Sequence, residues 1–206
     1  MKFGETVGAN LLASEMVFAR PLLFAKKAKL VGYKDPCSGQ KVSKEDLASK
    51  VIMAALQWLM EEGALTIRYV DRKEKGLLLS KRIKGHEISR EKDIQVDGLE
   101  GDLHRLSKGE VMLKDVISSL VGGKSDFPHS KVLARVERSL ERKGFGRYEG
   151  RIFKSFKLDC DKLEGSDYKF AELHSSLEEM SKRFPELEKE IGKVLRSLVE
   201  SDDDWD

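Results

Sequence analysis

The sequence predicts an α+β protein that is mostly helical, and three observations support this prediction. Apolar residues recur at helical spacing, mostly steps of three and four, within residues 43–63, 129–143 and 167–200, a spacing that keeps them on one face of a helix. In two places the spacing changes to alternation around a turn, which is typical of a β-hairpin. The composition, 40% apolar and 36% charged, fits a globular protein with one large core or two small ones.

Residues 1–42 are predicted to form an N-terminal helix and a turn-rich connector. The stretch 11–31 is rich in apolar residues, but Glu15, Arg20 and Pro21 interrupt it, so it falls short of the roughly 20 apolar residues that a transmembrane helix needs. We expect a buried helix that is kinked or split at Pro21, because proline removes a backbone donor. The alternative is an interfacial anchor whose lysines meet anionic lipid.

Residues 43–96 are predicted to form a helix followed by a β-hairpin. Ser43 suits the N-cap position, and the apolar stripe behind it continues to Gly63, a residue type that commonly ends a helix. The period then changes to alternation over residues 65–70. The charged run 71–76 is predicted to be the turn of the hairpin, with a return strand after it.

Residues 97–160 are predicted to form a second unit in which a helix is followed by a β-hairpin, with further elements before that helix. The apolar residues of the longest helix face inward at steps of one, three and four, and Gly144 is the expected stop. We expect a helix within the glycine-bounded stretch 98–109, a short strand at 111–113, a helix at 114–121, a turn at 122–128, a helix at 129–143 and a hairpin at 145–157.

This order of elements resembles that of the winged-helix superfamily over about residues 97–158. A second, less complete copy would occupy roughly residues 43–88. In winged helices the last helix before the hairpin commonly enters the DNA major groove, while the wing contacts the backbone. The resemblance therefore implies that the outer face of the helix at 129–143 is where function lies.

That outer face is predicted to carry a purely cationic stripe. At about 100° per residue, four basic side chains of the helix cluster on one side, opposite its apolar residues. The positive charge continues into the predicted hairpin with Arg147, Arg151, Lys154 and Lys157, which gives several possible phosphate contacts. The alternative is an ordinary solvated face, with Glu137 and Glu141 beside it. The predicted nucleic-acid or anion-binding residues are Lys131, Arg135, Arg138, Arg142, Arg147 and Arg151.

The run from Val132 to Gly144 continues into a predicted hairpin that contains Arg151, Ile152 and Phe153. An earlier predicted helix ends at Glu61, Glu62 and Gly63 before another hairpin. These two short segments resemble Golgi phosphoprotein-three-like proteins, which bind phosphoinositide head groups at membranes. The resemblance implies that Arg135 lies near lipid-contacting arginines and that the same cations serve an anionic head group. A complete head-group pocket is not matched.

Residues 167–200 carry the strongest regularity in the chain, a heptad-like apolar seam. We predict a C-terminal helical element that is either two helices divided near Pro185 or one bent rod. The seam would bury against a second copy of the chain, giving a homo-oligomer, or against the body of the same chain. An acidic tail follows at 201–206. The seam consists of Phe170, Leu173, Leu177, Met180, Phe184, Leu187, Ile191, Val194 and Leu198.

Other chemical signatures are weak. The 38 basic and 36 acidic residues give a net charge of +2, so any affinity for nucleic acid or a membrane must come from local patches. Cys37 and Cys160 have no partner motif, which favours a reducing, cytoplasmic location over a disulfide scaffold. The histidines lack metal-ligand spacing, and we find no nucleophile motif. We therefore expect no metal, no cofactor and no enzymatic activity.

The sequence thus predicts a cytoplasmic binding protein. Its main predicted function is that of a nucleic-acid-binding regulator or adaptor that self-associates through the C-terminal helices. The alternatives are a peripheral membrane module that binds anionic head groups through the same cations, and a protein–protein interaction module.

Overall fold

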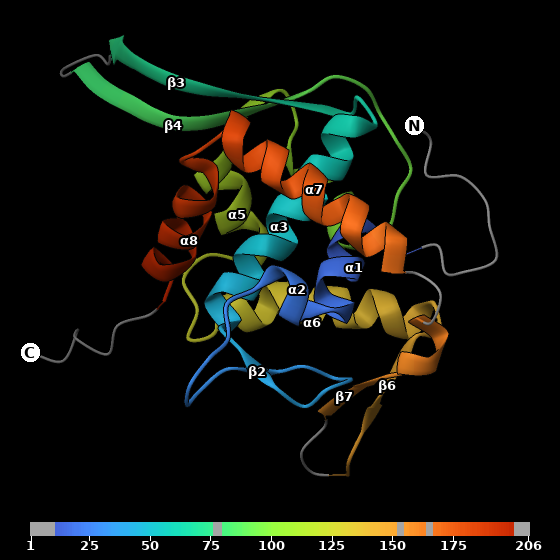
Figure 1. The fold of residues 1–206 in the computed structure, drawn as a ribbon. Coiled ribbons are helices and arrows are strands. Elements are labelled where there is room, and N and C mark those ends of the chain that lie inside the picture. Colours follow the sequence, from blue (N-terminus) through green and yellow to red (C-terminus); the bar gives the residue numbers. More distant parts are fainter. Residues whose placement is uncertain (1–10, 76–79, 152–154, 164–166, 200–206) are drawn as a thin grey trace, which may run out of the picture.

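The computed structural model describes residues 11–75, 80–151, 155–163 and 167–199 of the chain (Figure 1). Within these ranges the protein is α+β and mostly helical, as the sequence predicts. The helices are α1 (Ala13–Ala19), α2 (Pro21–Phe24), α3 (Lys44–Glu61), α4 (Gly98–Leu106), α5 (Leu113–Val121), α6 (Pro128–Arg142), α7 (Asp167–Arg183) and α8 (Leu187–Ser197), with a 3-10 turn η1 (Cys160–Leu163). The strands are β1 (Tyr33–Lys34), β2 (Lys41–Val42), β3 (Leu65–Lys75), β4 (Ser80–Arg90), β5 (Glu110–Met112), β6 (Gly146–Glu149) and β7 (Ser155–Leu158).

Helix α3 is the centre of the fold, and helices from every part of the chain pack around it (Figure 1). Its ends follow local rules: the Ser43 side chain accepts a hydrogen bond from the Asp46 amide at 3.2 Å, and Gly63 follows the helix with a φ of 64°. The helix is buried nearly all round, which requires apolar neighbours on several sides. Buried residues of all the predicted segments consequently belong to one continuous core.

The N-terminal helix is split at proline, as predicted. Helix α1 ends at Ala19 and α2 begins at Pro21, whose missing N–H is harmless at the first position of a helix. Met16, Val17 and Phe18 are buried against the rest of the core. No helix in the described ranges combines the length and the apolar character needed to cross a membrane.

The hairpin after α3 is longer than predicted. Strands β3 and β4 pair over eleven residues each and project beyond the helices as a ribbon (Figure 1). The charged run 71–76 was predicted to be a turn, but β3 continues through Lys75. Both faces of this ribbon carry charges that pair across the strands: Arg72 lies 2.8 Å from Glu87, and Arg82 lies 2.7 Å from Asp71. Cross-strand pairs of opposite charge therefore sustain a strand where composition alone indicates a turn.

Residues 98–158 contain the predicted order of helix, strand, helix, turn, helix and hairpin. Helices α4, α5 and α6 contact one another, and Gly122 ends α5 in the left-handed conformation with a φ of 78°. Strand β5 pairs with β4, whereas β6 and β7 form a two-stranded sheet of their own. The two β parts of this segment thus belong to different sheets. The order of elements is as predicted, and membership in the winged-helix superfamily stays a prediction.

The C-terminal seam is buried within the same chain. Helices α7 and α8 are separate, divided around Pro185, and they pack on α3, with α8 also contacting α5 (Figure 1). Most of the seam is at most 5% exposed, and Leu195 takes the inward position near Val194. Of the two arrangements that the sequence leaves open for the seam, the structure has the intramolecular one. The predicted acidic tail at 201–206 lies outside the described residues.

Truncating Ile191, a buried side chain of α8, should destabilise the whole protein. We expect Ile191→Ala to lower the free energy of unfolding by about 2–4 kcal/mol, because Ile191 is fully buried and the surrounding helices would leave a cavity. Val199→Ala is the control, since Val199 is 41% exposed and should change the value by less than about 0.5 kcal/mol. Urea unfolding measures both, and equal small effects would contradict the intramolecular packing of α8.

The two cysteines form a disulfide, which corrects the prediction of unpaired thiols. Cys37 follows β1 and Cys160 follows β7, and the bond joins positions that are 123 residues apart. Folding brings these two loops together beside the core, so sequence spacing gave no sign of the bond. The disulfide removes the argument for a reducing compartment that rested on unpaired cysteines.

Candidate functional site

Three arginines of α6 and one of α4 line a pocket between these two helices, which we call the arginine pocket. Its volume is about 410 Å³. Four arginines and three acids line it, so the lining has a net charge of +1. The lining residues are Asp97, Gly98, Asp102, Arg105, Arg135, Arg138, Glu141 and Arg142.

Helix α6 supplies three of these arginines because their spacing keeps them on one face. Val132, Val136 and Leu140 are fully buried on the opposite face, which fixes the rotation of the helix. Arg138 and Arg142 are exposed, and among the described residues neither has an ion-pair or hydrogen-bond partner. These two arginines can therefore donate hydrogen bonds to an external anion without first breaking an ion pair or hydrogen bond within the protein.

The other two stripe cations are held by the body of the protein. Lys131 Nζ donates to the Val121 carbonyl oxygen at 3.0 Å, at the C-terminal end of α5, where the helix dipole favours a cation. Arg135 donates to the Leu120 carbonyl and to Asp102 on α4, each at 2.5 Å. The stripe is consequently divided into two anchored cations and two open ones, a division that helical geometry alone does not reveal.

The hairpin cations lie apart from the arginine pocket. Arg147 pairs with Glu149 at 2.7 Å and lines a separate pocket of about 390 Å³ together with Lys157 and Lys162. Arg151 is exposed at the end of β6 and lines neither pocket. The structure thus brings together Arg135, Arg138 and Arg142, and leaves the other predicted site residues outside their pocket.

Glu137, an acid next to Arg138, faces a different neighbourhood. Its carboxylate accepts a hydrogen bond from the Tyr148 hydroxyl at 2.9 Å. Burial raises the pKa of Glu137, and burial together with the charge of Glu137 raises the pKa of Tyr148 and of Tyr33. Glu137 therefore serves a tyrosine cluster beneath the hairpin and does not line the arginine pocket.

Helix α4 supplies the residues that sequence reasoning missed. Arg105 and Asp102 lie one turn apart on α4, and Asp102 reaches Arg135 on α6 across 33 positions of sequence. Asp97 and Gly98 begin the same helix. Nothing in the local sequence identifies α4 as the neighbour of the cationic stripe, because that contact depends on how the three helices pack.

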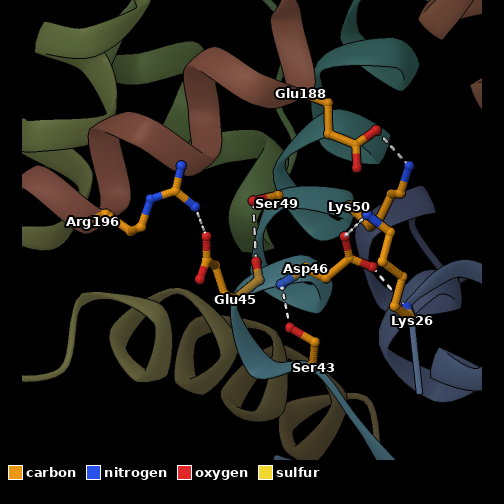
Figure 2. A network of polar contacts seen from close by, with 8 residues as sticks. All are labelled: Lys26, Ser43, Glu45, Asp46, Ser49, Lys50, Glu188 and Arg196. Carbon is orange, nitrogen blue, oxygen red and sulfur yellow. Dashed lines mark hydrogen bonds and ion pairs between the residues drawn. The ribbon is translucent and has the colours of Figure 1, made fainter. Parts of the chain in front are cut away.

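A larger pocket, of about 520 Å³, lies between α8 and the start of α3, but its charges are matched (Figure 2). Glu45 pairs with Arg196, and Lys50 Nζ lies 2.6 Å from Glu188 (Figure 2). The Lys26 amide donates to Asp46 at 2.7 Å. The first two pairs fasten α8 to α3, and the third holds the segment after α2 against α3. The lining has three cations and three acids, so it offers an anion no surplus charge.

Within the described residues, no three His, Cys, Asp or Glu side chains converge as metal ligands would. The arginine pocket likewise offers no such ligand set. Its chemistry is that of guanidinium groups, which donate several N–H groups in a planar fork suited to phosphate and carboxylate oxygens.

No protein-family model, curated protein or solved structure matches this chain.

Proposed function

We propose that the chain is a non-enzymatic binding protein that holds a phosphate group of its ligand in the arginine pocket. The observation that carries this proposal is the pair of open arginines, Arg138 and Arg142, in a concave site that Arg105 and Arg135 also line. Arginine donates two parallel hydrogen bonds to phosphate oxygens, and such charge-assisted bonds are about twice as strong as neutral ones.

The ligand that we propose first is nucleic acid, in a regulator or adaptor of the winged-helix kind. Lys131 is exposed on the same face of α6, and Arg147 and Arg151 are exposed on the hairpin, so further backbone phosphates would find cations on both sides of the pocket. Contacts of this kind set position and affinity without specifying sequence. Self-association, also part of this proposal, needs a surface other than the C-terminal seam, whose side chains are mostly buried.

A second candidate ligand is a phosphorylated lipid head group at a membrane surface. The shape of the site favours it: the open arginines lie in a pocket of about 410 Å³, which suits a compact group better than a long backbone. It also agrees with the resemblance of α6 and its hairpin to Golgi phosphoprotein-three-like proteins.

The cytoplasm is the compartment that we propose for either ligand. The disulfide limits this proposal to cells whose cytoplasm maintains disulfides, such as those of hyperthermophiles.

Replacing both open arginines tests the proposal. We expect Arg138→Ala/Arg142→Ala to weaken binding by about 10- to 100-fold, because each removes a charge-assisted hydrogen bond. The probes are a random 20-base-pair DNA duplex, by mobility shift across a salt series, and vesicles that contain a phosphatidylinositol monophosphate, by co-sedimentation. With DNA, the slope of log affinity against log salt should fall by about one per arginine lost.

The control is Lys182→Ala/Lys193→Ala, which removes two charges from α7 and α8, outside the arginine pocket. Binding that survives in this control and is lost in the arginine variant locates the ligand at the pocket. DNA binding alone supports the first ligand, and vesicle binding alone supports the second. If the unmodified protein binds neither probe, or if both double variants bind equally well, the proposed function is wrong.

A further inference from the structure

The Asp102 carboxylate forms ion pairs with two of the four arginines of the pocket. One carboxylate oxygen pairs with Arg105, and the other lies 2.5 Å from Arg135 Nη1. The Asp102 side chain is only 20% exposed, so it lies in the wall of the pocket. A carboxylate that receives two guanidinium groups in this way takes the contacts that two oxygens of a bound phosphate would take.

The two arginines differ in how firmly they are held. Arg135 has a second anchor, the Leu120 carbonyl at the end of α5, and its side chain is 31% exposed. Arg105 is 63% exposed, and among the described residues Asp102 is its only ion-pair partner. Arg105 can therefore turn from Asp102 to another anion while Arg135 keeps the orientation that two contacts give it.

We infer that Asp102 is a built-in competitor for the ligand of the arginine pocket. In the free protein its carboxylate engages Arg105 and Arg135, and ligand binding transfers Arg105 from Asp102 to the phosphate. This inference rests on the proposed function and adds a residue that sets the affinity of the site. An incoming group must displace a carboxylate, so weakly charged anions are disfavoured.

The other acids of the lining provide a comparison. Asp97 and Glu141 also line the pocket, but neither has an ion pair with a described residue. Neutralising any one of the three acids raises the net charge of the lining from +1 to +2. Only at Asp102 does the same change also release two arginines. A comparison with the other acids therefore separates the effect of releasing the arginines from the effect of the added net charge on ligand binding.

The test compares Asp102→Asn with Asp97→Asn, using the DNA duplex and the vesicles described above. We expect Asp102→Asn to bind about tenfold more tightly than the unmodified protein, because the change removes a negative charge beside the bound phosphate and frees the arginines that it held. Asp97→Asn should gain only about twofold, from net charge alone. A thermal melt of each variant checks that α4 and α6 stay packed.

A double variant tests the transfer itself. Asp102→Asn/Arg105→Ala should lose most of the gain, whereas the gain should persist if Arg105 is not the group that Asp102 releases. Equal gains in Asp102→Asn and Asp97→Asn overturn the inference, and so does weaker binding by a folded Asp102→Asn. In both cases the proposed function stands if Arg138→Ala/Arg142→Ala still loses binding. If neither the unmodified protein nor any of the variants binds the DNA duplex or the vesicles, both proposals fail.

Discussion

Reduction of the Cys37–Cys160 disulfide should lower the free energy of unfolding by about 2–5 kcal/mol. The bond closes a loop over a sequence separation of 123 residues, and a closed loop of that length restricts the unfolded chain far more than the folded one. It also ties the connector after β1 to the turn that follows β7. Urea unfolding with and without dithiothreitol measures the effect.

The matched control is the variant Cys37→Ser/Cys160→Ser. It should unfold at the same urea concentration as the reduced protein, and dithiothreitol should not change its midpoint. A protein whose stability is indifferent to dithiothreitol, although mass spectrometry shows the bond to be formed, would contradict the expected loop effect. Arg138→Ala/Arg142→Ala should respond to reduction as the unmodified protein does, because the arginine pocket lies between other elements.

Glu100→Gln should stabilise the protein at pH 8 by about 2–3 kcal/mol. Glu100 is fully buried, and burial raises the pKa of its carboxyl from 4.5 to about 7, although the Ser14 amide and hydroxyl both donate to it at 2.9 Å. A shift of this size corresponds to roughly 3 kcal/mol against the ionised form. Glutamine has nearly the same shape and hydrogen-bonding reach as glutamate, but its side chain cannot ionise.

The sign of the pH dependence follows from the direction of the shift. Between about pH 4.5 and pH 7 the folded protein binds more protons at Glu100 than the unfolded chain does, so this group lowers stability as the pH rises. The advantage of Glu100→Gln should therefore be near zero at pH 4.5 and complete above pH 7. Urea unfolding at several pH values measures the difference between the two proteins.

Glu15→Gln is the control of opposite sign. Glu15 is also buried, but its carboxylate accepts hydrogen bonds from Ser139 and Lys143, both at 2.7 Å. Removing its charge should destabilise the protein at neutral pH by about 1–3 kcal/mol. If Glu100→Gln were destabilising at pH 8, the burial of an ionised carboxylate would not be the dominant effect at that position.

Local features of the fold could be predicted from sequence. The N-cap at Ser43, the helix break at Pro21 and the glycines that end α3 and α5 each depend on a backbone rule that acts within a few residues. The order of elements from α4 to β7 follows from the same rules. One local prediction was wrong: residues 71–75 of the charged run belong to a strand, because charged side chains there find partners across the ribbon rather than along the chain.

The candidate site was only partly accessible to sequence reasoning. Helical spacing correctly placed Arg135, Arg138 and Arg142 on one face of α6. It did not show that Lys131 and Arg135 are held by carbonyl groups of α5, or that Asp102 and Arg105 complete the pocket from α4. The spacing within a single helix determines which of its side chains share a face. The neighbouring helices determine which of those side chains are left without a partner in the protein and can bind a ligand.

The sequence by itself determined the helical α+β class, the order of elements and the existence of a cationic face on α6, because periodicity, caps and glycines act over one or two turns. The tertiary structure alone decided that the C-terminal seam is buried within the chain, that Cys37 meets Cys160, and that Asp102 shares its carboxylate between two arginines. The disulfide joins positions 123 residues apart, and Asp102 lies 33 residues from Arg135 in the sequence. Such contacts arise only when the helices pack into one core.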